Sequence, residues 1–432
     1  MKGSGSNIKT LVAAMGLLGA VGGCAAHAPL RSEVAAVDAA SSVLQADFEE
    51  MVRTRQIPGA IAIIQRDGRT LVHARAGWMD VERREPLKQD ALFRLYSMSK
   101  PITSVAILML ADQGRLRLDD PVSKYLPELS AMRVYDSGGL DDMRTVPASG
   151  PITIAQLLTH TSGIIYHFTG DTPVHQYYRR YGVMRDTPVG RTPQDGPPAR
   201  SLDALLARLG EAPLLHQPGE TFAYSYSTTV LGAVIERIMA QPLNQALDTM
   251  LFTPLGMTDT GFFVSDVDLD RFTTLYRATE DGIEPAEQPE TSDYRDRDRL
   301  LDGGGAIVGT AADYLRFGRM LANGGEYGGK RFLARETVAA MFTPRTAMEG
   351  PDKVALPFGY GVSIGTRETA AAGLQPFGTV SWAGSGNTYF FVDHESRIVA
   401  LLMTHELTGA DQARTLRIRA VLDRAAAPFL KR

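Results

Sequence analysis

The apolar positions near the N-terminus predict a helix followed by a β-hairpin. Over residues 43–52 apolar side chains recur at the spacing of one helix face: Val43, Leu44, Phe48, Met51 and Val52. Residues 60–65 and 70–76 are strand-like apolar runs, and the segment between them contains Asp67-Gly68. An Asp-Gly pair between apolar runs favours a hairpin because both turn positions tolerate positive φ.

Helical spacing dominates the middle of the chain, and strand-like runs return near its end. A helix is expected from Ser97 to Gln113, just before Gly114. Residues 163–200 form a long stretch rich in Gly, Pro, Asp and Tyr, and such loops are usually functional or disordered. Further expected helices cover residues 153–158, 201–209, 227–239, 243–251, 310–323 and 410–425, and expected strands cover 388–392 and 398–403.

This order of elements indicates the architecture. Because strands occur at both ends of the chain, one sheet must combine N-terminal and C-terminal segments, with the middle forming a helical lobe beside it. A length of 432 residues fits one large domain or two intimate ones. The hydrophobic fraction of 44% is that of an ordinary globular protein. The net charge of −4 and the lack of long Lys/Arg runs argue against a nucleic-acid partner, and the oligomeric state stays open.

The first residues have the pattern of an export signal. Lys2 and Lys9 precede an apolar run over 11–21 that is too short for a stable membrane anchor. The run ends in Val21-Gly22-Gly23-Cys24, which resembles the bacterial lipobox and contains the chain's one cysteine. We therefore expect a lipoprotein signal peptide over 1–23, a lipid anchor on Cys24 and a tether over 24–42.

The same reading places the mature protein at a membrane that faces the periplasm. Ala25 after the cysteine favours the outer membrane by resemblance to other lipoproteins. The alternative is cleavage after Ala28, which would give a secreted, soluble periplasmic protein, although Pro29 would then follow the cut directly.

Ser97-Met98-Ser99-Lys100 is the first candidate for chemistry. Spacing of three places both side chains on one helix face, where a neutral lysine can take the serine's proton. The alternative is a helix N-cap with an incidental lysine, and residues 6–9 fit the same S-x-x-K pattern inside the signal peptide.

Other motifs add little. There is no G-x-S-x-G, and the histidines, among them His160, have no metal-ligand spacing, so no metal or cofactor is expected. Gly303-Gly304-Gly305 fits a turn before the helix that Thr310 opens. Aromatic side chains of the long loop could line a cleft entrance or pack within the loop: Tyr166, Phe168, Tyr177, Tyr178 and Tyr181.

Several segments in succession resemble family VIII carboxylesterases, the esterase branch of the class C β-lactamase and penicillin-binding-protein superfamily. They are the runs at residues 93–103, 157–163, 213–225 and 254–262. The resemblance covers most of the chain from about residue 45 onward. It implies a β-lactamase/transpeptidase-like α/β (α+β) fold, with an antiparallel sheet flanked by helices and an inserted all-helical lobe. The domain would cover 43–430, with a sheet lobe over about 43–95 and 300–430 and a helical lobe over about 96–299.

The resemblance also assigns roles. Ser97 is the expected nucleophile, with Lys100 and Tyr224 handling its proton. Tyr226 stands where β-lactamases carry an asparagine that contacts substrate, and Trp382-Ala383-Gly384 stands where they carry K-T-G or H-T-G. The resemblance therefore implies that these four residues border the substrate. By family position, the backbone N–H groups of Ser97 and Ser385 would form the oxyanion hole.

The expected function is hydrolysis of small to medium acyl esters through an acyl-enzyme, with β-lactam hydrolysis as a weak side activity. Trp382 in place of a lysine removes the cation that would hold a β-lactam carboxylate, which favours neutral esters. A β-lactamase or D,D-peptidase is the alternative, and a non-catalytic binding module on the same fold is the second.

Overall fold

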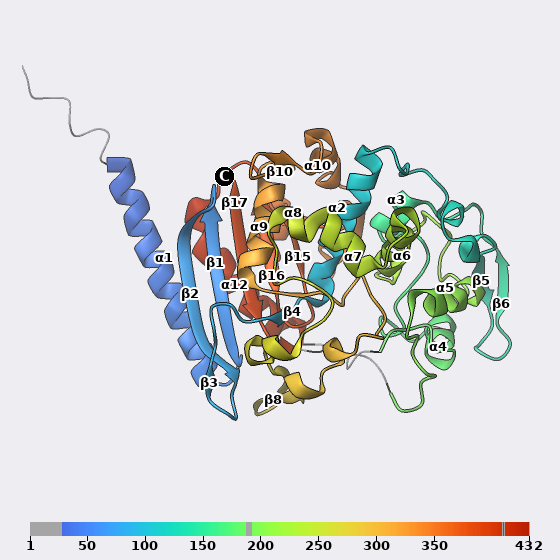
Figure 1. Ribbon diagram of the computed structural model, residues 1–432, viewed down its shortest axis with the longest axis horizontal. Coiled ribbons are helices and arrows are strands. Elements are labelled where there is room, and N and C mark those ends of the chain that lie inside the picture. The colour runs from blue at the N-terminus through green and yellow to red at the C-terminus, as the bar shows by residue number, and fades with distance from the viewer. Residues whose placement is uncertain (1–27, 187–191, 408, 410, 432) are drawn as a thin grey trace, which may run out of the picture.

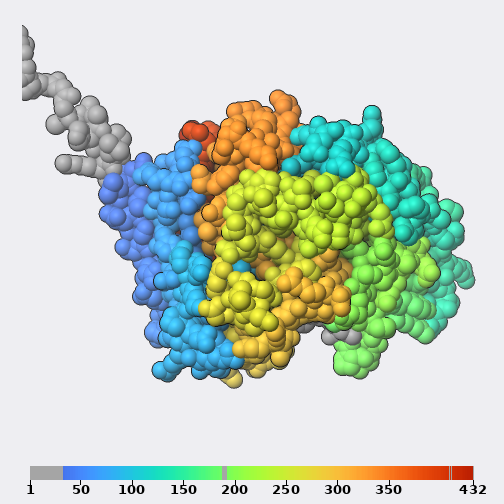
Figure 2. All heavy atoms as spheres, viewed as in Figure 1, coloured from blue at the N-terminus to red at the C-terminus, as the bar shows by residue number. Residues whose placement is uncertain are grey.

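The computed structural model describes residues 28–186, 192–407, 409 and 411–431 (Figure 1). The predicted signal peptide and Cys24 lie outside these residues. Figure 2 shows the N-terminal segment beside C-terminal segments on one side of the molecule, and the middle of the chain on the other. Among the described helices, none has the length and apolar character that crossing a bilayer requires.

A nine-stranded antiparallel sheet joins the two ends of the chain, as the sequence predicts. Its order is β12-β13-β14-β15-β16-β17-β1-β2-β3, so the N-terminal hairpin adds directly to the C-terminal strand β17. The strands are β1 (Gly59–Arg66), β2 (Arg69–Asp80), β3 (Glu85–Pro86), β12 (Thr346–Glu349), β13 (Ala355–Phe358), β14 (Ser363–Ile364), β15 (Val380–Ala383), β16 (Tyr389–Asp393) and β17 (Ile398–Thr404).

Successive side chains of strand β1 face two separate hydrophobic cores. Ile61 and Ile63 belong to the large cluster shared with the helical lobe and with α9 (Ala311–Ala322). Ala62 and Ile64 point the other way, into the cluster beneath α1 (Ala28–Arg53) and α12 (Gln412–Ala426). Because successive strand residues face opposite sides, both faces of this central strand are buried.

The helix α1 corrects the predicted tether over 24–42. It begins at Ala28, and Ala40, Leu44 and Phe48 are buried against the outer face of the sheet. No glycine interrupts residues 28–53, and the segment is rich in alanine, the strongest helix former. The sequence pattern missed these turns because their apolar positions are sparse before Leu44.

The inserted lobe is mainly helical, and its predicted helices are confirmed to within a few residues. Its helices are α2 (Ser99–Asp112), α3 (Ile154–Leu158), α4 (Pro173–Arg180), α5 (Leu202–Glu211), α6 (Ser227–Met239), α7 (Leu243–Leu247) and α8 (Thr253–Leu255). The expectation of an all-helical lobe is wrong in one part, because β5 (Arg133–Ser137) and β6 (Arg144–Pro147) form a hairpin there.

The boundary between the lobes also differs from the prediction at residues 275–287. Strand β7 (Leu275–Thr279) pairs with β8 (Gly282–Glu287) on one side and with the C-terminal β18 (Glu406–Leu407) on the other, so this three-stranded sheet belongs with the C-terminal segment. The remaining described elements are the pairs β4 (Phe93–Arg94) with β9 (Val308–Gly309) and β10 (Glu326–Tyr327) with β11 (Lys330–Arg331), and the helices α10 (Arg335–Met341) and α11 (Arg367–Ala371).

Substitution of Phe48 tests whether α1 is part of the folded core. Phe48→Ala should lower the free energy of unfolding by about 3–5 kcal/mol, because it leaves a cavity under the helix. Val43→Ala on the same helix is the control, since Val43 is 56% exposed and should cost less than about 0.5 kcal/mol. Urea unfolding followed by circular dichroism measures both, and equal small losses would show that α1 is not packed as described.

Candidate active site

Ser97 lies at the seam between the lobes, in a short 3₁₀ turn over Tyr96–Met98 that leads into α2. The N-cap of α2 is Met98, and no side chain caps the helix, so the N-cap interpretation of Ser97 is wrong. Tyr96 has φ of +45°. A bulky residue rarely adopts this left-handed conformation, and such strain concentrates at functional sites.

Lys100 is buried one helical turn from the serine. Its Nζ donates to Ser97 Oγ at 3.2 Å and to the backbone oxygen of Gly304 at 2.7 Å, and the residue is 1% exposed. The rings of Tyr224 and Tyr166 lie 4.6 and 5.2 Å from Nζ. Burial lowers the pKa of Lys100 to about 7, against the opposing charge of Asp302. The lysine is therefore ready to accept a proton near neutral pH.

Tyr224 completes the group that the sequence predicted. It precedes α6, and its loop is held where Ala223 N donates to His160 O and where Tyr166 N donates to Tyr224 O. Burial raises the pKa of Tyr224, while the Ser97 hydroxyl and Trp382 act in the opposite direction. The phenol is therefore neutral at neutral pH, which makes Lys100 the better resting base and leaves Tyr224 to relay a proton.

His160 supports this loop rather than the chemistry directly. It follows α3 with φ of +55°, is 1% exposed, and its Nδ1 is 2.9 Å from Ser225 Oγ. Its ring packs 5.0 Å from that of Tyr224. His160 therefore packs at the end of α3, against the loop that carries Tyr224.

The turn between β15 and β16 brings Ser385 to the same place. A Cβ at Gly384 would lie 2.3 Å from Leu95 O, so only glycine allows this turn to pack on the chain just before Ser97. A Cβ at Gly386 would lie 3.5 Å from the ring of Tyr96, an ordinary contact, so that position does not require glycine. In the part of the chain described, the Ser385 N–H has no recorded acceptor. It is therefore available as a donor beside Ser97.

The two residues before Gly384 point in opposite directions. Trp382 packs with the inner core, with ring centroids 5.7 Å from Tyr224 and 5.1 Å from Phe358, and its indole Nε1 has no partner in hydrogen-bonding geometry among the described residues. Ala383 packs against the outer core instead. This corrects the expectation that the Ala383 side chain borders the substrate.

These groups surround a narrow cleft with a volume of about 70 Å³. Tyr226 is fully buried in its wall, and its hydroxyl is 2.8 Å from His167 Nδ1, so that hydroxyl is engaged within the protein. Of the loop aromatics, Tyr166 and Phe168 line the cleft and stack at 4.9 Å, whereas Tyr177, Tyr178 and Tyr181 do not line it. The lining consists of Tyr96, Ser97, Tyr166, Phe168, Arg185, Tyr224, Tyr226, Asp302, Gly304, Gly305 and Ser385.

The sequence analysis missed an ion pair in this lining. Arg185 Nε lies 2.9 Å from Asp302 Oδ2, and the side chains are 13% and 1% exposed. Asp302 Oδ1 also accepts from Thr229 Oγ1 at 2.6 Å and from Gly304 N at 2.7 Å. The Asp302 carboxylate thus fixes Gly304, whose backbone oxygen accepts the hydrogen bond from Lys100 Nζ. The glycine run Gly303-Gly304-Gly305 predicts the turn after Asp302, but it does not indicate that Asp302 pairs with Arg185.

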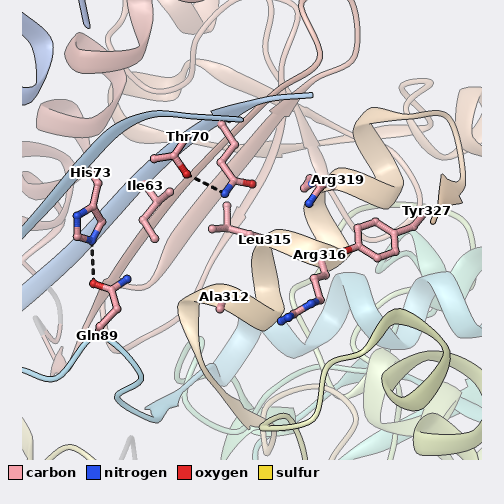
Figure 3. A pocket seen from close by; sticks show the side chains of 10 residues that line it. Ile63, Thr70, His73, Gln89, Ala312, Leu315, Arg316, Arg319 and Tyr327 are labelled. Carbon is pink, nitrogen blue, oxygen red and sulfur yellow. Dashed lines mark hydrogen bonds between the residues drawn. The ribbon is translucent and has the colours of Figure 1, made fainter. Parts of the chain in front are cut away.

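A larger cavity lies elsewhere, between the β1–β2 hairpin and α9 (Figure 3). Its volume is about 430 Å³, and side chains such as His73, Gln89 and Arg319 line it. It contains no serine beside a lysine, so the smaller cleft is the better candidate for acyl chemistry. Among the described residues, no cluster of His, Cys, Asp or Glu could hold a metal ion.

Comparison with known proteins identifies the family and the fold. The family model described as Beta-lactamase matches residues 44–423. Esterase EstB of Burkholderia gladioli is 34% identical over 392 residues, covering 85% of this chain and 92% of EstB. Protein Rv1367c of Mycobacterium tuberculosis is 35% identical, covering 83% and 88%. The structure of EstCE1, "a hydrolase with promiscuous acyltransferase activity", superposes with a TM-score of 0.75 at 28% identity, covering 90% and 99%.

The reactivity of Ser97 should follow the protonation of Lys100. We expect the rate of Ser97 labelling by a fluorophosphonate to rise with pH through an apparent pKa of about 7. The reason is that only neutral Lys100 can accept the serine's proton, and the fraction of this form grows as pH passes the lowered pKa. Labelling rates between about pH 5 and 9 measure the profile, with Ser97→Ala as the blank.

Two substitutions in the cleft should move this profile in opposite directions. Asp302→Asn removes a charge that raises the pKa of Lys100 and should shift the rise to lower pH. Arg185→Gln removes a charge that lowers this pKa and should shift the rise to higher pH. Shifts in the same direction, or a wild-type rate that does not change near pH 7, would contradict the assignment of Lys100 as the base.

Proposed function

Because this chain belongs to the β-lactamase family, we propose that it is a serine carboxylesterase that hydrolyses small to medium acyl esters. The observation that carries the proposal is the contact of buried Lys100 Nζ with Ser97 Oγ at 3.2 Å. The similarity of the chain to Esterase EstB, 92% of which it covers, supports ester hydrolysis. The fold and family make the chain a serine hydrolase.

The first half of the reaction is acylation. Ser97 Oγ attacks the ester carbonyl and passes its proton to neutral Lys100, directly or through Tyr224. The backbone N–H groups of Ser97 and Ser385 donate to the developing oxyanion, and losing one such donor typically costs about 3 kcal/mol of transition-state stabilisation. When the tetrahedral intermediate collapses, the alkoxide takes the proton back from Lys100 or Tyr224 and leaves as the alcohol.

The second half of the reaction is deacylation, which frees Ser97 from the acyl group. Water gives a proton to Lys100 and attacks the acyl carbonyl, and the same N–H groups stabilise the second oxyanion. The Ser97–acyl bond then breaks, the acid leaves and Ser97 Oγ recovers its proton. No other group from the protein is needed for this cycle.

The walls of the cleft support neutral substrates. Most side chains that line it are aromatic: Tyr96, Tyr166, Phe168, Tyr224 and Tyr226. The one guanidinium among them, that of Arg185, is already paired with Asp302. Such a site favours an apolar acyl group over the carboxylate that a β-lactam carries, so β-lactam hydrolysis is proposed only as a weak side activity.

A paired assay separates the esterase from its alternatives. It measures turnover of short-chain p-nitrophenyl esters and of a chromogenic cephalosporin, for the chain without its first 24 residues and for its Ser97→Ala variant. We expect ester turnover that the substitution reduces at least about 10³-fold, with slow cephalosporin cleavage. Efficient cephalosporin turnover with little ester cleavage would favour a β-lactamase. Activity that is unchanged in Ser97→Ala would remove Ser97 from the mechanism.

We also propose that the mature protein is a lipoprotein anchored through Cys24 to a membrane that faces the periplasm. The lipobox-like Val21-Gly22-Gly23-Cys24 supports this proposal. In a bacterial host that processes lipoproteins, the full chain should enter the membrane fraction, whereas Cys24→Ala should lose palmitate labelling. Equal labelling of the two proteins, or wild-type protein entirely in the soluble periplasmic fraction, would contradict it.

A further inference from the structure

A buried carboxylate lies behind the turn that carries Ser385 and takes no part in the chemistry described above. Glu406, in β18, is fully buried. Its Oε2 accepts from Asn387 Nδ2 at 2.8 Å, and its backbone N–H is 3.4 Å from Gly386 O. Asn387 and Gly386 both belong to the β15–β16 turn. Two separate contacts therefore join Glu406 to the residues directly after Ser385.

The same carboxylate is held from behind by α12. Arg414 Nε lies 3.2 Å from Glu406 Oε1, with the arginine side chain 12% exposed. The other end of this guanidinium donates from Nη2 to the backbone oxygen of Gln56, just before β1. The turn is thus connected through Asn387, Glu406 and Arg414 to helix α12 and to the segment just before β1.

The turn depends on such support because of its own conformation. Asn387 has φ of +56°, a left-handed conformation that asparagine tolerates but does not require, and its N–H donates to Gly384 O at 3.1 Å. Burying a carboxylate is costly unless hydrogen bonds and a counter-charge compensate. Consistent with that cost, burial raises the pKa of Glu406 to about 7, although Arg414 and Asn387 oppose the shift.

We propose that Glu406 is a positioning residue that, through its bond to Asn387, aims the Ser385 N–H at the oxyanion. The inference rests on the proposed function, because it assumes that Ser385 donates to the developing charge. An oxyanion hole acts only when its donors are fixed before the reaction, since reorienting them during the reaction costs free energy. A bond outside the cleft can therefore control kcat without touching the substrate.

The test removes either partner of the hydrogen bond between Asn387 and Glu406. Glu406→Ala removes the acceptor, and Asn387→Gly removes the donor while leaving a residue that adopts positive φ freely. Both should lower kcat for a p-nitrophenyl ester about 10- to 100-fold with KM little changed. Both should raise the inhibition constant of phenylboronic acid by a similar factor, because the adduct of this inhibitor with Ser97 places an oxygen in the oxyanion hole. Glu406→Gln keeps an acceptor for Asn387 and should retain most of the activity.

Asp313→Asn is the matched control. Asp313 is also a buried carboxylate paired with an arginine, Arg316, and no hydrogen bond joins it to the β15–β16 turn among the described residues. It should change the melting temperature as much as Glu406→Ala does while leaving kcat and boronate affinity unchanged. Equal losses of kcat in Asp313→Asn would show a general effect of stability and overturn the proposal.

The outcomes separate this inference from the proposed function. Wild-type ester turnover with unchanged kcat and boronate affinity in Glu406→Ala and Asn387→Gly overturns the positioning role alone. A wild type without esterase activity, whose boronate binding the two substitutions still weaken, overturns the proposed substrate and leaves the positioning role supported. If Glu406→Ala does not fold, Asn387→Gly decides by the same measurements.

Discussion

Burial of the Lys100 ammonium is the constraint on which the rest of the site depends. A lysine pKa of about 7 in place of 10.5 corresponds to about 5 kcal/mol in favour of the neutral form. Among the described residues, no carboxylate bonds to Nζ, whose hydrogen-bond partners are Ser97 Oγ and Gly304 O. Asp302 acts one step away, by fixing Gly304 through its backbone N–H, and its own charge is balanced by Arg185. This arrangement orients the lysine without holding it permanently charged.

The fold supplies this environment by joining distant segments. α2 is buried over residues 99–110, and Ser97, just before it, lines the cleft. The sheet needs both ends of the chain, and the turn between its inner strands β15 and β16 packs on Leu95 because Gly384 has no side chain. The nucleophile Ser97 and the base Lys100 share one segment, whereas Tyr224 and the oxyanion donor Ser385 come from two others that no local interaction would bring to it. Their geometry depends on the packing of the whole molecule.

The sequence predicts the features that depend on local interactions and misses those that depend on contacts between distant segments. The β1–β2 hairpin, the helices and the Ser97–Lys100 pair depend on local periodicity and spacing, and they are confirmed in the structure. Tyr224 could be assigned only by resemblance to an esterase family. The match to EstB confirms that resemblance, whereas the role of Tyr224 stays a prediction. The short strands β12–β14 and the hairpin β5–β6 were missed because they are held mainly by pairing with neighbours. The Arg185–Asp302 pair and the Glu406–Asn387 bond join separate segments, and no spacing rule indicates either.

The most direct test of the account is the titration of Lys100 itself. Heteronuclear NMR of protein with ¹⁵N-labelled lysine can follow each Nζ with pH, and a Lys100→Arg variant identifies the signal of interest. The account predicts that this signal titrates near pH 7, well below the exposed lysines. A Lys100 signal that titrates with the others, near the ordinary value of about 10.4, would contradict it, because a permanently charged lysine cannot accept the proton of Ser97.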